Sequence, residues 1–458
     1  MRRTWLLAAL LGVATAVLRL PRALGDAFWQ DEVASARIIR EPTFGGMIHH
    51  VALTESTPPF WYALGWLAHR GGVSVHDVRL LSVVAGAVLV TIVVRLTAEV
   101  APLPLAALSG VLLAVGAQFT THGRELRAYE LFALLTVVFA IALHRAALSP
   151  TRGPLVALGV LAAAGMMTHY FFAFTLVAGL AWLWLEPTAP VGRRRGTAVV
   201  VVALVACAPW LPLFIDQYRH DRYSWIGPFD IRELVETPLR ILSPLIATPV
   251  TGVMFLAWLA AGAWIAWRRG PLERLVAALS LAPLLLAGAT WAAGFNTFAI
   301  RNMIGIGPFV VVLALLPMTA IRAVHRLPLA AAVAVAAIAL FVVGQKPALP
   351  FNGIAAALVR EGWRPPDSVV IQGGFYDFRS PLEWYLPHLP VLTRGRISEF
   401  RGHPAFAVLS RHALPRRVVT RVMRVGSYVV VRVRPRASRR WFRRGVILTA
   451  MAKSKPTT

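Results

Sequence analysis

Two adjacent carboxylates, Asp31 and Glu32, follow the first long apolar segment of the chain. Their neighbours Phe28 and Trp29 are aromatic, so they lie where partial removal from water can raise the pKa of a carboxyl group. One of the two could therefore act as a general base. In the structural alternative, Asp31 caps a short helix, and Glu32 is stabilised in its first turn by the helix dipole.

Four arginines, Arg79, Arg124, Arg127 and Arg301, stand next to the ends of other apolar segments. Charged groups at such positions in a membrane protein are costly and usually mark a pathway or a bound ion. The planar guanidinium group is also well shaped to bind phosphate through paired hydrogen bonds. Each arginine alone could instead extend its charged end to the membrane surface. Together they predict a binding site for a phosphate.

A third group of polar residues has no diagnostic spacing. His49-His50 and Glu55 share one loop, and His169-Tyr170 follows a different apolar segment. These residues could bind a divalent metal or orient an acceptor, and histidines at a surface or a helix end are the structural alternative. The single cysteine, Cys207, excludes a disulfide framework and a cysteine-based metal site. The sequence therefore assigns no cofactor.

The elements that must position these residues are membrane helices. Of the 458 residues, 57% are hydrophobic and 15% are charged, and the charged residues gather between long apolar runs. A hydrocarbon core of roughly 30 Å needs about 20 apolar residues per helix, because lipid cannot satisfy an exposed backbone. We predict eleven spans, the first of them a retained anchor, at residues 4–22, 79–97, 102–121, 128–146, 153–169, 171–186, 197–215, 248–267, 273–294, 302–320 and 327–344.

The charges of the loops predict the orientation. With a cytoplasmic N-terminus, arginine-rich loops such as 193–195 and 268–274 lie inside and most acidic loop residues lie outside, as the positive-inside rule requires. The apolar segment 58–67 is too short to span, and its aromatic residues favour a position flat in the outer interface. The candidate residues then share the outer side with two long loops, 23–78 and 216–247.

Residues 345–458 form the third outer region, which we predict to be a basic α/β domain. It contains 21 Lys or Arg and five Asp or Glu. Ser368–Gly374 has the pattern of a buried strand, and Tyr428–Arg434 alternates like a half-exposed strand. The charge favours membrane lipids with anionic headgroups as partners, and the outer location argues against nucleic acid. The tail 439–444 fits either contact with the membrane surface or a disordered basic tail.

Six short motifs occur in the order found in one family of membrane enzymes. They are Trp29-Gln-Asp-Glu, Ser56-Thr-Pro-Pro-Phe-Trp-Tyr62, Val78-Arg-Leu-Leu-Ser-Val-Val-Ala-Gly86, Gly123-Arg-Glu-Leu-Arg-Ala-Tyr129, Thr168-His-Tyr170 and Ala299-Ile-Arg-Asn302. Over this part, the chain resembles the GT-C membrane glycosyltransferases (glycosyltransferase family 39), which include protein O-mannosyltransferases and bacterial lipid A aminoarabinose transferases. The resemblance implies an all-α polytopic membrane domain over residues 1–344, followed by the α/β domain.

The resemblance also implies an activity. It implies transfer of a sugar from a polyprenyl-phosphate donor to an acceptor hydroxyl at the outer face of the bacterial inner membrane, with inversion at the anomeric carbon. Asp31 matches the catalytic aspartate, with Glu32 beside it. The residues expected to bind the donor phosphate are Arg127, Arg301, Arg79 and Arg124, and those expected to line the substrate pocket are Tyr129, His169, Tyr170 and Glu55.

The chain departs from the aminoarabinose transferases at two positions. Thr57 stands where they have a lysine, and Ala34 stands where they have an arginine. Lipid A as acceptor and the metal site of that subfamily are therefore not implied, and the acceptor could be a protein, a lipid or a polysaccharide.

Proteins of two other classes would also have many spans and outward arginines. A transporter or flippase of lipid-linked sugars usually shows two related halves with charges near the membrane midplane. No such internal repeat is visible here, and the candidate arginines lie at the ends of spans. A non-catalytic homologue that binds a lipid-linked sugar is the remaining alternative.

Overall fold

The computed structural model describes residues 2–219, 226–295, 298–345, 350–364, 369–371, 379–386, 391–392, 406–410, 419–425 and 428–433. The chain divides into two compact units. The first comprises Met1–Leu24 and Ser35–Gln345, and the second comprises Gly25–Ala34 and Lys346–Thr458. Residues 1–344 were predicted to form one domain. The structure differs in the short segment 25–34, which groups with the C-terminal part of the chain.

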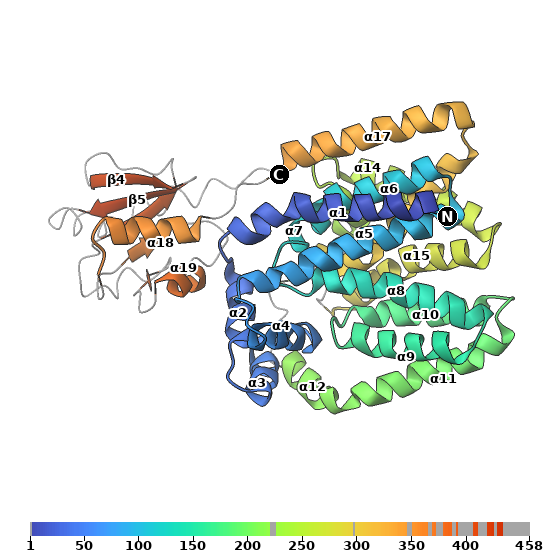
Figure 1. Ribbon diagram of the computed structural model, residues 1–458, viewed down its shortest axis with the longest axis horizontal. Coiled ribbons are helices and arrows are strands. Elements are labelled where there is room, and N and C mark those ends of the chain that lie inside the picture. The colour runs from blue at the N-terminus through green and yellow to red at the C-terminus, as the bar shows by residue number, and fades with distance from the viewer. Residues whose placement is uncertain are drawn as a thin grey trace. The chain divides into compact units, whose positions relative to one another are not determined.

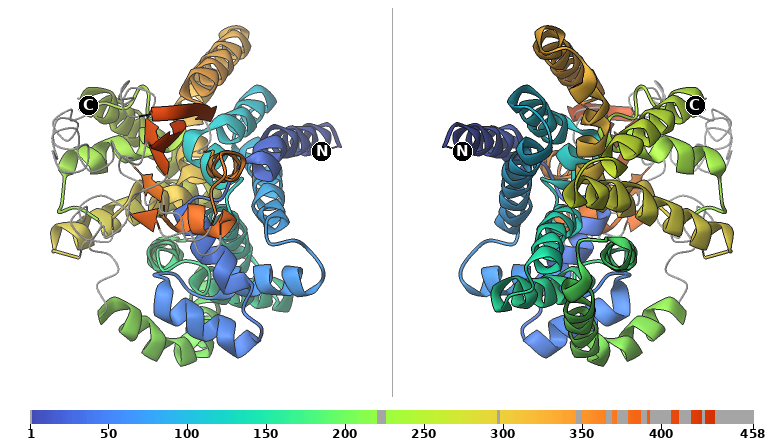
Figure 2. Two further views of the ribbon diagram at one scale, coloured as in Figure 1. Left: turned by 90° about the vertical axis from the view of Figure 1, so that its left-hand side faces the viewer. Right: turned by 90° about the vertical axis from the view of Figure 1, so that its right-hand side faces the viewer.

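The helices of the first unit form a bundle (Figures 1 and 2). In chain order they are α1 (Arg2–Gly25), α2 (Gln30–Ile39), α3 (Phe44–Thr54), α4 (Phe60–Arg70), η1 (Asp77–Arg79), α5 (Leu80–Val100), α6 (Leu103–Val115), α7 (Ala117–His122), α8 (Tyr129–Leu148), α9 (Arg152–Met166), α10 (Phe172–Leu185), α11 (Pro190–Cys207), η2 (Ala208–Trp210), α12 (Leu211–Arg219), α13 (Ile231–Leu242), α14 (Pro249–Trp267), α15 (Pro271–Ala292), η3 (Ile300–Ile306), α16 (Gly307–Leu315), η4 (Pro317–Ala320) and α17 (Ala323–Gly344). The first residues of α2 belong to the second unit.

Within the described residues, eight helical stretches are long and apolar enough to cross a membrane, so the chain is a multi-pass membrane protein. They are Arg2–Gly25, Asp77–Val100, Tyr129–Leu148, Pro190–Arg219, Pro249–Trp267, Pro271–Ala292, Ile300–Ala320 and Ala323–Gly344. The three other predicted spans coincide with the shorter apolar helices α6, α9 and α10. The predicted continuous helix over 102–121 is wrong, because an extended residue, Gly116 (ψ 135°), separates α6 from α7.

The apolar segment near residue 60 forms α4. This helix has 11 residues, so it is roughly 16 Å long and too short for a hydrocarbon core of about 30 Å. At the other extreme, the apolar stretch Ile300–Ala320 is 83% buried inside the protein, whereas that of α17 is 6% buried. The first is therefore central in the bundle, and the second faces its surroundings at the edge (Figure 2).

The loops predicted to lie inside meet at one end of the bundle. Arg269 Nη1 donates to the carbonyl of Val100 (3.1 Å), and its Nη2 donates to Thr319 Oγ1 (2.5 Å). Arg274 Nε and Nη2 donate to the two carboxylate oxygens of Glu186, both at 2.8 Å. Four loops that are distant in sequence are thus joined by hydrogen bonds.

The second unit contains α18 (Phe351–Arg360), β1 (Val369–Ile371), α19 (Arg379–Tyr385), β2 (Val391–Leu392), β3 (Phe406–Ser410), β4 (Val419–Val425) and β5 (Tyr428–Val433). The strands form one sheet in the order β2-β1-β3-β5-β4. Strand β1 is parallel to β2 and β3, and β5 is antiparallel to β3 and β4. Strands β1 and β5 fall within the two segments with strand patterns, and the tail 439–444 lies outside the described residues.

The segment 25–34 packs in the second unit through its aromatic residues. Phe28 is 1% exposed, and its ring meets that of Trp384 edge to face at 5.7 Å between centroids. The backbone N–H of Phe28 donates to Tyr385 Oη at 2.9 Å. Trp29 packs against the core that includes Phe351. These contacts explain why residues 25–34 group with the C-terminal part of the chain.

Candidate functional site

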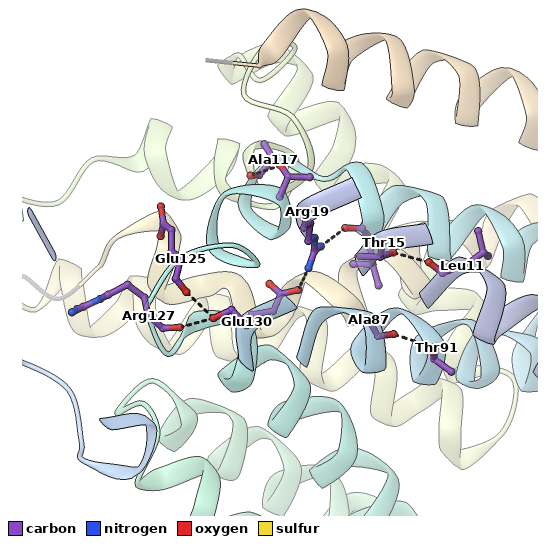
Figure 3. A network of polar contacts seen from close by, with 12 residues as sticks. Leu11, Thr15, Arg19, Ala87, Thr91, Ala117, Glu125, Arg127 and Glu130 are labelled. Atoms are coloured by element: carbon purple, nitrogen blue, oxygen red, sulfur yellow. Dashed lines mark hydrogen bonds and ion pairs between the residues drawn. The ribbon is translucent and has the colours of Figure 1, made fainter. Parts of the chain in front are cut away.

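The loop between α7 and α8, residues 123–128, carries Arg124 and Arg127. Ser82 on α5 holds its backbone, because Ser82 Oγ hydrogen-bonds to the carbonyl of Glu125 at 2.7 Å and lies 3.4 Å from that of Arg127. Figure 3 shows Glu125 and Arg127 on this loop, immediately before α8. The motif Gly123–Tyr129 therefore forms a short fixed connection, and this connection presents Arg127.

Arg127 lies at the centre of a buried polar network. Its Nη1 donates to Ser35 Oγ at 3.1 Å, to both carboxylate oxygens of Glu55 at 3.2 and 3.3 Å, and to Tyr62 Oη at 3.3 Å. Arg127 is 6% exposed and Glu55 is 5% exposed. Two residues that the sequence analysis assigned separately, one to phosphate binding and one to the substrate pocket, thus form an ion pair.

Tyr62 contributes a neutral hydroxyl to this network. Burial raises its pKa well above the usual value of 10, against the opposing effect of Arg127, and the carboxylate of Glu55 raises it further. Tyr62 Oη also lies 3.2 Å from Thr57 Oγ1. The motif Ser56–Tyr62 is therefore part of the site, with Tyr62 as a hydrogen-bonding residue rather than an interfacial aromatic.

Tyr129, His169 and Arg301 form an aromatic and cationic cluster beside α8. The Arg301 guanidinium lies 5.9 Å from the centre of the Tyr129 ring. The rings of Tyr129 and His169 are 5.7 Å apart, and Phe132 stacks on His169 at 4.7 Å with an angle of 15°. Arg301 was expected to bind the donor phosphate, and Tyr129 and His169 to line the substrate pocket; the structure brings the three together from η3, α8 and the α9–α10 connection.

The pKa of His169 is shifted by its surroundings. Burial lowers its pKa to about 3, and Arg127 and Arg301 both contribute to this shift through their charge. Arg301 lies beside the ring of Tyr129, which follows Arg127 by two residues, so segments far apart in the sequence contribute to this cluster. His169 is neutral at physiological pH, and its Nδ1 accepts the backbone N–H of Phe171 at 3.2 Å.

Arg79 and Arg124 occupy different surroundings. Arg79 is buried, and its Nη1 donates to the carbonyl of Ala23 and to His76 Nε2, both at 3.1 Å. These bonds join the end of α1 to the start of α5. Arg124 is half-buried in the loop that carries Arg127.

Tyr170 links two outer segments. Its hydroxyl donates to Gln217 Oε1 at 2.6 Å and accepts from Trp210 Nε1 at 2.8 Å. Gln217 Nε2 donates in turn to the carbonyl of Val51 at 3.1 Å. The Tyr170 hydroxyl therefore orients Gln217, and Gln217 links α12 to α3. Of the predicted loop 216–247, residues 220–225 lie outside the described residues.

Asp31 and Glu32 lie in the first turn of α2, within the segment 25–34 of the second unit. Glu32 is 1% exposed, and its Oε2 accepts the backbone N–H of Trp29 at 3.3 Å. The helix therefore begins with a capping interaction made by Glu32, and Asp31, for which the structural alternative was a helix cap, is the second residue of α2. Asp31 is half-buried.

Metal ligation finds no support among the described residues, where no three His, Cys, Asp or Glu side chains gather in a way that could hold an ion. In the loop that suggested a metal, His50 Nδ1 pairs with Glu41 Oε1 at 2.7 Å. We therefore assign no residue to a metal.

Sequence reasoning missed Ser35 and Tyr62 as partners of Arg127. Ser35 has no local signal, because a single serine within a short mixed helix gives no indication of a distant arginine. Tyr62 did have one, since it ends a motif that begins next to Glu55.

Known proteins resemble this chain in part of its sequence and in its fold. Residues 56–212 match the family model for dolichyl-phosphate-mannose-protein mannosyltransferases, and no match was found among curated proteins. The structure of ArnT from Cupriavidus metallidurans in the apo state is 15% identical and aligns with a TM-score of 0.55 over 92% of this chain and 97% of its own. The arabinofuranosyltransferase AftD from Mycobacteria is 12% identical, with a TM-score of 0.52 over 94% of this chain and 40% of its own.

The archaeal oligosaccharyltransferase AglB from Archaeoglobus fulgidus is 13% identical, with a TM-score of 0.50 over 89% of this chain and 69% of its own. The resemblance to GT-C glycosyltransferases is thus confirmed, by the family model over residues 56–212 and by the shared fold over most of the chain.

Proposed function

We propose that the chain is an inverting glycosyltransferase that moves a sugar from a polyprenyl-phosphate donor to an acceptor hydroxyl at the non-cytoplasmic face of the membrane. The observation that carries this proposal is the buried hydrogen-bond network of Arg127 with Ser35, Glu55 and Tyr62, together with the Arg301 guanidinium 5.9 Å from the centre of the nearby Tyr129 ring. AglB, whose fold is similar, was solved with a dolichol-phosphate, which supports a lipid phosphate as the ligand.

The arginines would bind the donor phosphate and neutralise the charge that it gains. Cleavage of the bond between the sugar C1 and the phosphate oxygen leaves a polyprenyl phosphate with one more negative charge. Preorganised cations in a buried site stabilise such charge as it develops, typically by a factor of roughly 10²–10³ in kcat per group. Burial of Arg127, at 6% exposure, and the neutral state of His169 beside it both favour this electrostatic role.

Asp31 would be the general base. In this role it takes the proton of the acceptor hydroxyl while the acceptor oxygen forms a bond to C1 from the side opposite the phosphate, which inverts that carbon. Such a base contributes roughly 10²–10⁴ in rate. Glu32 is occupied in capping α2, which favours Asp31 over its neighbour.

The orientation and the number of spans complete the proposal. The arginine-rich loops joined at one end of the bundle would be cytoplasmic, as the positive-inside rule predicts. The eight long helices and the shorter α6, α9 and α10 would make eleven spans, followed by an α/β domain outside the cytoplasm.

The test supplies the purified full-length protein, in lipid nanodiscs, with a panel of polyprenyl-phosphate sugars and measures release of polyprenyl phosphate. We expect turnover with at least one donor, and Asp31→Asn should lower kcat by at least 10² while donor binding persists. Asp230→Asn is the matched control, because Asp230 is an exposed N-cap of α13 and asparagine caps equally well.

Two results would count against an enzyme. A folded protein that releases polyprenyl phosphate from no donor would exclude the proposed reaction. If Asp31→Asn left transbilayer movement of a lipid-linked sugar unchanged, and no donor was consumed, the flippase alternative would be correct.

A further inference from the structure

A second pair of buried charges lies within the bundle and has no part in the reaction above. Arg19 on α1 and Glu130 on α8 form an ion pair of 2.6 Å between Nη1 and Oε1, and both side chains are at most 1% exposed. Arg19 Nη2 also donates to the carbonyl of Leu113 on α6 at 3.3 Å. Figure 3 shows the two side chains pointing toward one another between the helices.

Two glycines make room for this arginine. A Cβ atom at Gly86 on α5, or at Gly123 in the loop before α8, would overlap Arg19 Nη1. At Gly86 it would also come within 2.6 Å of Glu130 Oε1. The guanidinium is therefore enclosed by backbone from α5, α6 and the 123–128 loop, so that its position is tightly defined.

The same elements hold the site. Gly86 is one helical turn after Ser82, which binds the backbone of Glu125 and Arg127. Glu130 is three residues after Arg127 and lies in the first turn of α8. The ion pair is thus attached directly to the connection that presents Arg127. On the other side, α1 leads into the segment that carries Asp31.

A buried ion pair is a poor way to gain stability, because removal of both charges from water offsets most of their attraction. In some proteins a buried pair instead fixes the register of the helices that carry it, and the enclosure of Arg19 by backbone fits that role. Misplacement of a reacting group by about 1 Å can reduce a rate by roughly 10².

We propose that Arg19 and Glu130 are positioning residues for the proposed sugar transfer: their ion pair sets the place of the 123–128 loop and hence of Arg127. This inference rests on the proposed function. It predicts that loss of the pair lowers turnover per intact site more than it lowers donor binding.

The experiment compares the wild type with Arg19→Met/Glu130→Leu, which removes both charges together, and with Glu130→Asp, which keeps them but shortens the link. Binding of undecaprenyl phosphate counts intact sites, and kcat is expressed per site. We expect both variants to bind undecaprenyl phosphate, to show kcat at least tenfold lower per site, and to change the donor KM less than threefold. Arg19→Lys, which keeps the charge, should retain kcat within threefold.

Glu99→Gln is the control, because Glu99 forms an ion pair with Arg95 on α5 at a surface position and should leave kcat unchanged. An inactive wild type would contradict the proposed function and not the role of the ion pair. An active wild type allows that role to be judged from the variants. If wild type is active and the double variant has kcat per site within twofold of it, the positioning role is wrong. Failure of both test variants to give folded protein that binds undecaprenyl phosphate would make the pair a folding element and would also overturn the inference.

Discussion

Replacing Arg127 by glutamine tests whether this residue acts on substrate or only holds the fold. Arg127→Gln removes the guanidinium that pairs with Glu55 at 3.2 Å and leaves that carboxylate, at 5% exposure, without this cation. A variant that combines Arg127→Gln with Glu55→Gln removes both charges and avoids the unbalanced one. Comparing the two variants therefore separates the cost of a buried charge from the loss of a catalytic group.

The magnitude follows from the geometry. At 3.2 Å and an effective dielectric constant of about 20, the Coulomb attraction of the pair is about 5 kcal/mol. Loss of one partner of a buried pair usually costs about 3–5 kcal/mol. We expect Arg127→Gln to lower the free energy of unfolding by that amount and the double variant to recover at least about 2 kcal/mol of it.

Turnover should not recover with stability. Both variants should lose roughly 10²–10³ in kcat, because neither retains the cation that neutralises the leaving phosphate. Unfolding in detergent, followed by tryptophan fluorescence, gives the stability, and release of polyprenyl phosphate gives kcat. A double variant that regained both stability and turnover would show that Arg127 is structural, and the reasoning from phosphate neutralisation would be refuted.

Three further predictions concern the surroundings of the site. The pKa of His169 is about 3 in the folded protein and near 6.5 when unfolded, so the unfolded state binds the extra proton and stability falls as pH drops below 6.5. His169→Gln should remove about 2 kcal/mol of the loss between pH 7 and pH 5, measured as thermal stability at both values; an unchanged pH dependence would contradict the assignment. Tyr170→Phe should cost about 1–3 kcal/mol by leaving Gln217 incompletely hydrogen-bonded, with kcat unchanged; a large loss of kcat instead would return Tyr170 to the substrate pocket. Gly86→Ala should destabilise the protein by more than about 2 kcal/mol, because the added methyl group overlaps Arg19. Gly153→Ala, where the methyl group enters open space, should leave Tm unchanged. Equal Tm values for the two variants would show that Arg19 is not tightly enclosed at Gly86.

The membrane helices could be predicted from the sequence because their requirement is one of composition and length. A span must be apolar over its whole length, and that pattern is local. The break at Gly116 was not predicted, because the apolar run 103–115 was extended through the more polar residues 117–121 to reach the length of a span.

The candidate site was predicted in part for a similar reason. Arg127, Arg301, Tyr129 and His169 stand in motifs whose order is visible in the chain, and the structure joins them. The hydrogen-bond partners of these residues could not be predicted in the same way. The pairing of Glu55 with Arg127 joins residues 72 positions apart, which no local pattern records, and the adjacent carboxylates Asp31 and Glu32 give the same local signal at the start of α2. The buried Arg19 was counted as part of an apolar span, since a single charge does not disturb its average.

The hydrogen bond between Phe28 and Tyr385 has a consequence for how this gene can change. It joins the ten-residue stretch that contains Asp31 to a region encoded more than a thousand nucleotides downstream. Substitutions in either stretch therefore fall under a common selective constraint. A hybrid protein that took its C-terminal region from a relative would need residues 25–34 from the same source. Shortened forms that lack that region would also be poor references for kinetics, because they lack the partners of Phe28.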